Sequence, residues 1–110
     1  MKLILSSLFL VLSAANALIL DNPPAAGWAS GETVTEHWQT RPADPAHFTL
    51  TLESYASRGN HALIAIVETA PGSVTFTVPD VSAGDYVLNA VNMTDDNDIY
   101  AQTAPFAISQ

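Results

Sequence analysis

Hydrophobic and polar residues alternate most regularly between positions 47 and 54. Three apolar side chains fall on one side of an extended chain and three polar ones on the other: Phe48, Leu50 and Leu52 against Thr49, Thr51 and Glu53. Successive side chains of a β-strand point to opposite faces of the sheet, so a period of two predicts a strand with one buried face. We therefore expect this segment to lie in a sheet whose other face meets water.

Six further runs have the length and composition of strands. They cover residues 18–20, 33–38, 62–67, 73–78, 85–93 and about 99–108, the last with a break at Pro105. The run 62–67 is continuously apolar, which predicts a central strand. Turns between the runs recur about every 8–12 residues along the chain, a spacing typical of β-sandwiches. The pattern predicts an all-β, immunoglobulin- or fibronectin-like antiparallel β-sandwich of about seven strands. A small antiparallel barrel has the same periodicity and stays open as the alternative.

One local motif favours the sandwich. Gly84-Asp85-Tyr86 opens a strand directly after a loop that begins at Pro79. In immunoglobulin-like sandwiches a tyrosine at this place donates a hydrogen bond back to the preceding loop, an arrangement called the tyrosine corner. We expect Tyr86 to make that bond.

The N-terminus has the features of a secretory signal. Lys2 is followed by an apolar run over residues 3–12, and Ala15-Asn16-Ala17 has small residues at the cleavage positions. The run is too short to cross a bilayer, which takes roughly 20 residues. The sequence thus predicts a signal peptide over residues 1–17, one domain over residues 18–110, and a secreted protein.

Charge and cysteine content narrow the possible partners. The chain has 3 basic and 11 acidic residues, and removal of Lys2 leaves two arginines, a formal charge of −9. Phosphate backbones and anionic lipid surfaces would repel such a chain, so we expect no nucleic-acid partner. The C-terminus has no apolar tail, and we expect no membrane anchor. With no cysteine, the chain has no thiol nucleophile or zinc–thiolate site.

Several short motifs occur in the order of a known family. They are Leu18-Ile19-Leu20-Asp21-Asn22-Pro23, Trp28-Ala29-Ser30-Gly31, Val34 to Trp38, Leu50-Thr51-Leu52, Phe76-Thr77-Val78-Pro79 with Ala83-Gly84-Asp85-Tyr86, and Pro105-Phe106-Ala107-Ile108. In these motifs the chain resembles the KNH-like N-terminal immunoglobulin-like domain of fungal cell-wall-synthesis proteins. That domain also occurs in Ser/Thr-rich, GPI-anchored fungal membrane proteins. The resemblance implies a fungal extracellular or cell-wall protein, in some members linked to β-1,6-glucan assembly, and no known catalytic residue.

The chain departs from the family pattern in two ways. Glu36 stands between Val34 and Trp38, where the family usually has an aliphatic residue. Because an unpaired buried carboxylate is costly, we expect Glu36 either to be exposed or to have a partner. The Ser/Thr-rich stalk and lipid tail of many relatives are missing, which favours a protein that is free or held non-covalently in the wall.

Exposed aromatic rings are the first candidates for binding a sugar. Trp28 lies between Gly27 and Gly31, and Tyr55 and Tyr100 lie near strand ends. Sugar-binding sites use such rings against the apolar faces of sugars, so these three residues are our candidate ligand-binding set. Packing in the core is the commoner fate of a tryptophan and is the preferred interpretation for Trp28.

The segment after residue 93 suggests two other sites. Asp95, Asp96 and Asp98 surround an amide in what we expect to be an acidic turn, and calcium prefers such oxygen clusters. The segment lacks EF-hand spacing, so a solvated turn is the favoured interpretation. The three histidines have no metal-ligand spacing. Asn92-Met93-Thr94 is an N-glycosylation sequon, and we expect a glycan on Asn92.

These observations give a leading hypothesis and an alternative. No nucleophile–base pair or positioned carboxylate pair is visible, so we expect no enzymatic activity and no cofactor. The leading hypothesis is a secreted fungal cell-wall protein that binds or organises wall glucan, with a wall polysaccharide or an extracellular protein as its partner. The alternative is a secreted protein-interaction module, either an effector or an inhibitor of a hydrolase. The sequence does not fix the oligomeric state.

Overall fold

The computed structural model describes residues 18–110, and the predicted signal peptide lies outside the described residues. Within them the chain forms nine strands and no helix, so no helix there could cross a membrane. The strands are β1 (Ile19–Leu20), β2 (Trp28–Ala29), β3 (Thr33–Gln39), β4 (His47–Ser54), β5 (Asn60–Glu68), β6 (Ser73–Thr77), β7 (Gly84–Asn92), β8 (Asp95–Gln102) and β9 (Phe106–Ser109).

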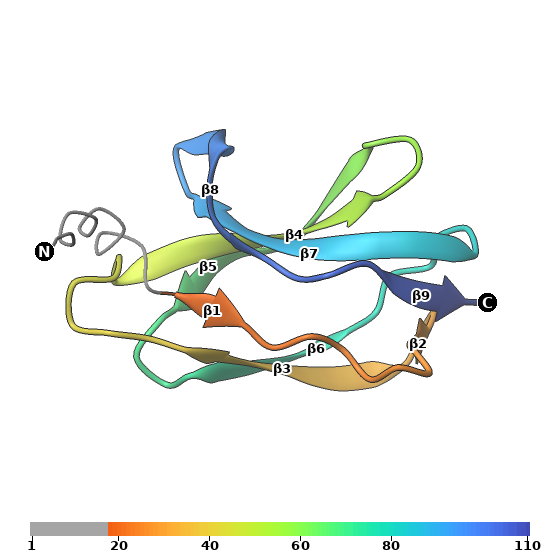
Figure 1. Ribbon diagram of the computed structural model, residues 1–110, viewed down its shortest axis with the longest axis horizontal. Helices are drawn as coiled ribbons and strands as arrows, with labels where there is room; N and C mark the ends of the chain where they lie inside the picture. The colour runs from red at the N-terminus through yellow and green to blue at the C-terminus, as the bar shows by residue number, and fades with distance from the viewer. Residues whose placement is uncertain (1–17) are drawn as a thin grey trace, which may run out of the picture.

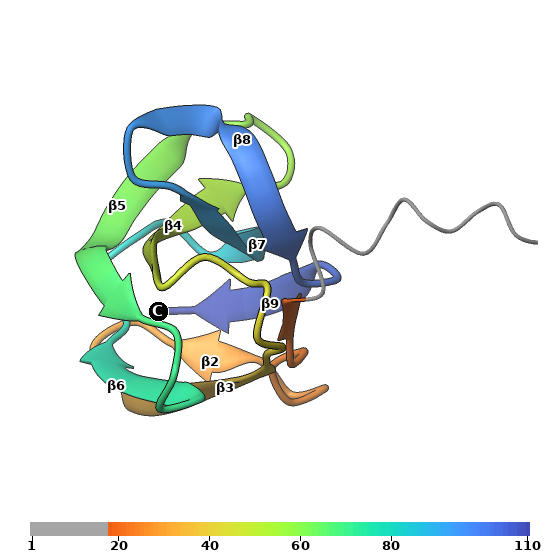
Figure 2. The same cartoon turned by 90° about the vertical axis from the view of Figure 1, so that its left-hand side faces the viewer.

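The strands form two facing layers (Figures 1 and 2). The smaller sheet has the order β1-β3-β6, and the larger has the order β2-β9-β7-β4-β5 with β8 paired to β7. Neighbouring strands are antiparallel except β2 and β9, which run parallel. The architecture is the predicted immunoglobulin-like sandwich and not a barrel.

The core fills the space between the layers. Its side chains come from alternate positions of the central strands, as the alternation in residues 47–54 predicts: Val34, Trp38, Phe48, Leu50, Leu52, Leu88 and Ala90. The Trp38 and Phe48 rings meet edge to face, with their centroids 5.2 Å apart. The indole nitrogen of Trp38 donates to the Thr69 carbonyl at 2.9 Å, which satisfies its polar atom inside the core.

The tyrosine corner is confirmed. The Tyr86 hydroxyl donates to the Ser82 carbonyl at 2.6 Å, which ties the loop between β6 and β7 to the start of β7. Just before β2, Gly27 has a φ of 78°. A side chain there would collide with the Ala107 carbonyl, so only glycine lets β2 approach β9 this closely.

Four predictions about strands need correction. Ala62–Val67 lies in β5 at the edge of the large sheet and not at its centre, and Ile66 is 64% exposed. Two register shifts in the β4–β5 pairing bend this strand away from its neighbour. The break predicted at Pro105 separates two strands, β8 and β9, but β8 begins at Asp95 and not at about residue 99. Trp28 belongs to the short strand β2, which is not among the predicted strands. The polar side of β4 is largely covered, as the next subsection describes.

Candidate functional site

The outer face of the large sheet holds polar side chains that are shielded from water. Thr51 and Glu53 of β4 and Asn89 of β7 are buried there, although the alternating pattern predicts an exposed face. The loop after β4 and strand β8 curl over them, leaving a cleft of about 170 Å³. We call it the outer polar cleft, lined by Thr51, Glu53, Arg58, Asn60, Asn89, Asp96, Asn97 and Ile99.

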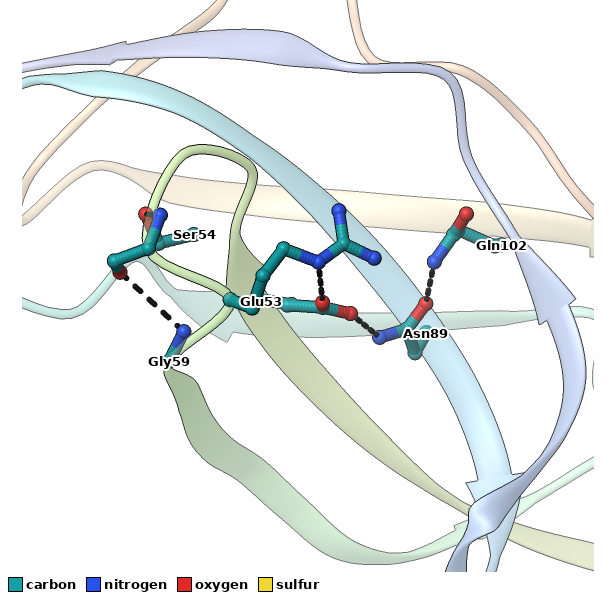
Figure 3. Close-up of polar contacts among 7 residues, drawn as sticks. Glu53, Ser54, Gly59, Asn89 and Gln102 are labelled. Atoms are coloured by element: carbon teal, nitrogen blue, oxygen red, sulfur yellow. Dashed lines mark hydrogen bonds and ion pairs between the residues drawn. The ribbon is translucent and has the colours of Figure 1, made fainter.

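A chain of charge and amide contacts crosses this cleft (Figure 3). Arg58 Nε lies 2.8 Å from Glu53 Oε2. Asn89 Nδ2 donates to Glu53 Oε1 at 2.8 Å, and Gln102 Nε2 donates to Asn89 Oδ1 at 2.7 Å. Each carboxylate oxygen of Glu53 therefore has a partner, and the network fixes the orientation of these side chains before any ligand arrives.

Arg58 is held in a strained backbone conformation. Its φ is 63°, a left-handed value that is uncommon outside glycine. The loop imposes it through short backbone bonds, from Arg58 N to the Ser54 carbonyl and from Ser54 N to the Gly59 carbonyl, both 2.8 Å. The result is a guanidinium group aimed back at Glu53. Strain of this kind, of order 1–3 kcal/mol, is often found at functional sites.

Thr51 gives the cleft an unused polar group. The residue is only 5% exposed, and its hydroxyl has no hydrogen-bond partner among the described residues. A buried hydroxyl without a partner costs roughly 1–3 kcal/mol. A ligand in the cleft could supply that partner and offset the cost.

The structure separates the three predicted aromatic residues. Tyr55 is 51% exposed, and its ring centroid lies 5.8 Å from the Arg58 guanidinium carbon, so it stands beside the outer polar cleft. Tyr100 is half-buried and packs against the core. Trp28 is only 7% exposed and meets Phe76 and Phe106 edge to face, which leaves neither ring face open to a sugar.

The predicted acidic turn is a strand. Asp95, Asp96 and Asp98 all belong to β8, and the turn itself is Met93-Thr94. Asp96 lines the outer polar cleft, and Asp98 accepts a hydrogen bond from Asn92 at 3.1 Å. The structure brings together no group of three acidic or histidine side chains within residues 18–110 that could hold a metal ion, and the calcium site stays a prediction. Asn92 ends β7 beside this turn, and its side-chain oxygen accepts from Thr94 N and Thr94 Oγ1, both at 2.9 Å.

The structure contradicts both expectations for Glu36, that it is exposed or that it has a partner. It is only 2% exposed, and its Oε2 has no hydrogen-bond partner among the described residues. Burial raises the pKa of Glu36 from 4.5 to about 8, and the nearby charge of Asp21 adds to the shift. At neutral pH this carboxyl group is therefore mostly protonated.

Apart from Asp96, the residues that build the outer polar cleft were not identified from the sequence. One signal was present, because Asn89 interrupts an otherwise apolar strand interior from Tyr86 to Val91. Pairing that asparagine with Glu53 and Arg58 required the β4–β7 register, which no local pattern specifies.

Comparison with known proteins finds one family. The family model described as "Kre9/KNH-like N-terminal Ig-like domain" matches residues 23–108. Neither the curated proteins nor the solved structures contain a match.

Proposed function

The chain belongs to the Kre9/KNH-like N-terminal Ig-like domain family, which is related to the fungal cell wall, and from this we propose that it is a secreted, non-enzymatic wall protein that binds wall glucan in the outer polar cleft. The observation that carries the proposal is the cleft itself. It combines a fixed carboxylate, a guanidinium group, several amides and the unused Thr51 hydroxyl, with the exposed Tyr55 beside it. Ligand sites use a few such fixed polar groups for specificity.

The chemistry of the cleft suits a neutral sugar. The positive charge of Arg58 is balanced by Glu53, and the other charged residue of the lining is Asp96, whose carboxylate can accept hydrogen bonds from sugar hydroxyl groups. The amides of Asn60 and Asn97 offer both donors and acceptors, which match sugar hydroxyl groups.

Replacement of Thr51 by valine tests the proposal without damaging the fold. Thr51→Val removes a hydroxyl that has no protein partner, so the free energy of unfolding should rise or stay unchanged. Retention on insoluble β-glucan in a pull-down should fall several-fold if that hydroxyl contacts the sugar.

Thr69→Val is the matched control. Thr69 also has a buried hydroxyl without a hydrogen-bond partner among the described residues, but it lies away from the cleft. It should affect stability in the same way and leave retention at the wild-type level. Absence of wild-type retention on β-glucan, or equal retention by the two variants, would count against a glucan site here.

A specific feature supports the alternative, a protein-interaction module. The edge strand β5 exposes Ile66 at 64%. An edge strand has unpaired backbone groups with which a strand of another protein can pair, and Ile66 adds an apolar side chain to that edge. Crosslinking of the protein in culture medium, with an Ile66→Ser variant as the comparison, distinguishes a protein partner from a polysaccharide.

A further inference from the structure

A second cleft lies on the other sheet, where the chain crosses between the layers. After β1, the backbone N–H of Asp21 donates a hydrogen bond to the His37 carbonyl of β3 at 3.0 Å. Pro23 and Pro24 then carry the chain away toward β2 in the large sheet. The space left beside β3 is a cleft of about 440 Å³, which we call the crossover cleft, and its lining includes Asp21, Asn22, Pro23, Trp28, Glu32 and Glu36.

Glu36 gives this cleft a buried carboxyl group without a protein partner. The side chain lines the cleft, is 2% exposed, and has no hydrogen bond to its Oε2 among the described residues. Such a group is costly to bury. A ligand that brings a donor or a positive charge to it would offset that cost.

The charges around Glu36 select for a cation. Asp21 and Glu32 line the same cleft, whereas no lysine or arginine does. His37 is the remaining titratable residue of the lining, and it belongs to the exposed side of β3. Because no group of three such side chains in residues 18–110 could hold a metal ion, an organic cation fits better than a metal.

We propose that the crossover cleft binds the primary ammonium group of an amino sugar, with Glu36 as its counter-ion. On binding, the Glu36 carboxyl group releases its proton to solvent, and the resulting carboxylate pairs with the ammonium group. Asn22 and Thr33 offer amide and hydroxyl groups to the sugar ring. The cleft is on the opposite sheet from the outer polar cleft, so this proposal does not depend on glucan binding there.

Titration of the full chain with oligomers of β-linked glucosamine tests the proposal. Trp28 lines the cleft, so tryptophan fluorescence reports binding, and calorimetry in two buffers of different ionisation enthalpy reports proton release. We expect the glucosamine oligomers to change the tryptophan fluorescence, and the N-acetylated oligomers, which have no ammonium group, to leave it unchanged. Affinity should increase as the pH rises from about 5, because less of the Glu36 proton then has to be displaced, and should fall again at the pH where the sugar's own amine loses its proton.

Two variants assign the site. Glu36→Gln should weaken binding by at least about tenfold and abolish the proton release. Asp21→Asn, at an exposed position that should not affect folding, should weaken it several-fold. Thr69→Val, whose side chain lines neither the crossover cleft nor the outer polar cleft, should bind like the wild type. Three results would overturn the proposal. The acetylated oligomers could bind equally well, both Glu36→Gln and Asp21→Asn could keep the wild-type affinity, or the protein could bind a lysine-rich peptide in place of the amino sugar.

Discussion

Glu36 shows how one residue can make a stable fold sensitive to pH. It takes an inward position of β3 between two core residues, Val34 and Trp38, where an aliphatic side chain would fit without cost. Burial raises its pKa to about 8, so the folded state binds a proton more tightly than the unfolded state does. The tighter proton binding stabilises the folded state. This contribution is fully present below pH 4.5, the pKa of the unfolded chain, and is lost as the pH rises through about 8, the pKa of the folded state.

We predict that the wild-type protein becomes less stable between about pH 5 and pH 8, by roughly 3 kcal/mol at neutral pH. Glu36→Gln, which cannot ionise, should have a much flatter pH dependence, and Glu36→Leu should be more stable than the wild type at pH 7. Chemical denaturation across this pH range measures all three. Parallel pH profiles for the wild type and Glu36→Gln would mean that other acidic residues cause the dependence.

At the scale of elements, the tyrosine corner connects the loop after β6 to strand β7. Tyr86→Phe keeps the buried ring and removes only the hydrogen bond to the Ser82 carbonyl. Because that carbonyl can then bind water, we expect a loss of about 1 kcal/mol in the free energy of unfolding. Tyr100→Phe is the control, since its hydroxyl has no hydrogen bond within residues 18–110, and it should change stability little. Equal effects of the two changes would show that the corner bond contributes nothing.

The predicted glycan site lies in the β7–β8 hairpin. Asn92 is half-buried at the end of β7, and its amide nitrogen donates to Asp98 Oδ2 at 3.1 Å. Glycan attachment replaces one of the two hydrogens on that nitrogen, and the remaining N–H can still donate to Asp98. We predict occupancy during secretion, seen as a mass decrease after treatment with a glycosidase that removes N-linked glycans.

Asn92→Gln and Thr94→Ala should both remove that mass difference, because each destroys the sequon. Asp98→Asn keeps the sequon, should retain the glycan, and serves as the control for changes in the hairpin itself. A protein secreted without a glycan in its wild-type form would refute the prediction.

The elements that could be predicted are those specified by local pattern. The strand His47–Ser54 matches its prediction because its alternation meets one core face, and Tyr86 matches because the corner depends on adjacent residues. The predicted central position of β5 was wrong, because the same apolar sequence can form a strand in the centre of a sheet or at a bulged edge. The outer polar cleft depends on contacts between Glu53, Arg58 and Asn89 that are distant in sequence, and alternation alone predicts that this face meets water.

At the scale of the whole molecule, negative charge is the dominant property. Residues 18–110 hold eleven acidic residues and two arginines, Arg41 and Arg58, so most carboxylates have no basic residue to pair with. Their mutual repulsion opposes the compact state. The domain has no disulfide to offset this, because the chain has no cysteine, and its stability rests on the packed core and the backbone ladders.

We predict that added sodium chloride stabilises the domain at neutral pH, because it screens repulsion between exposed carboxylates over a distance of about 10 Å or less. The melting temperature should rise between low salt and about 0.5 M salt, and the rise should shrink as the pH approaches the isoelectric point near 4.3. The same salt effect should persist in Glu36→Gln, since a buried carboxyl is screened little. A melting temperature that falls with salt would mean that attractive pairs such as Glu53–Arg58 outweigh the repulsion, which would make the outer polar cleft the main electrostatic contributor to stability.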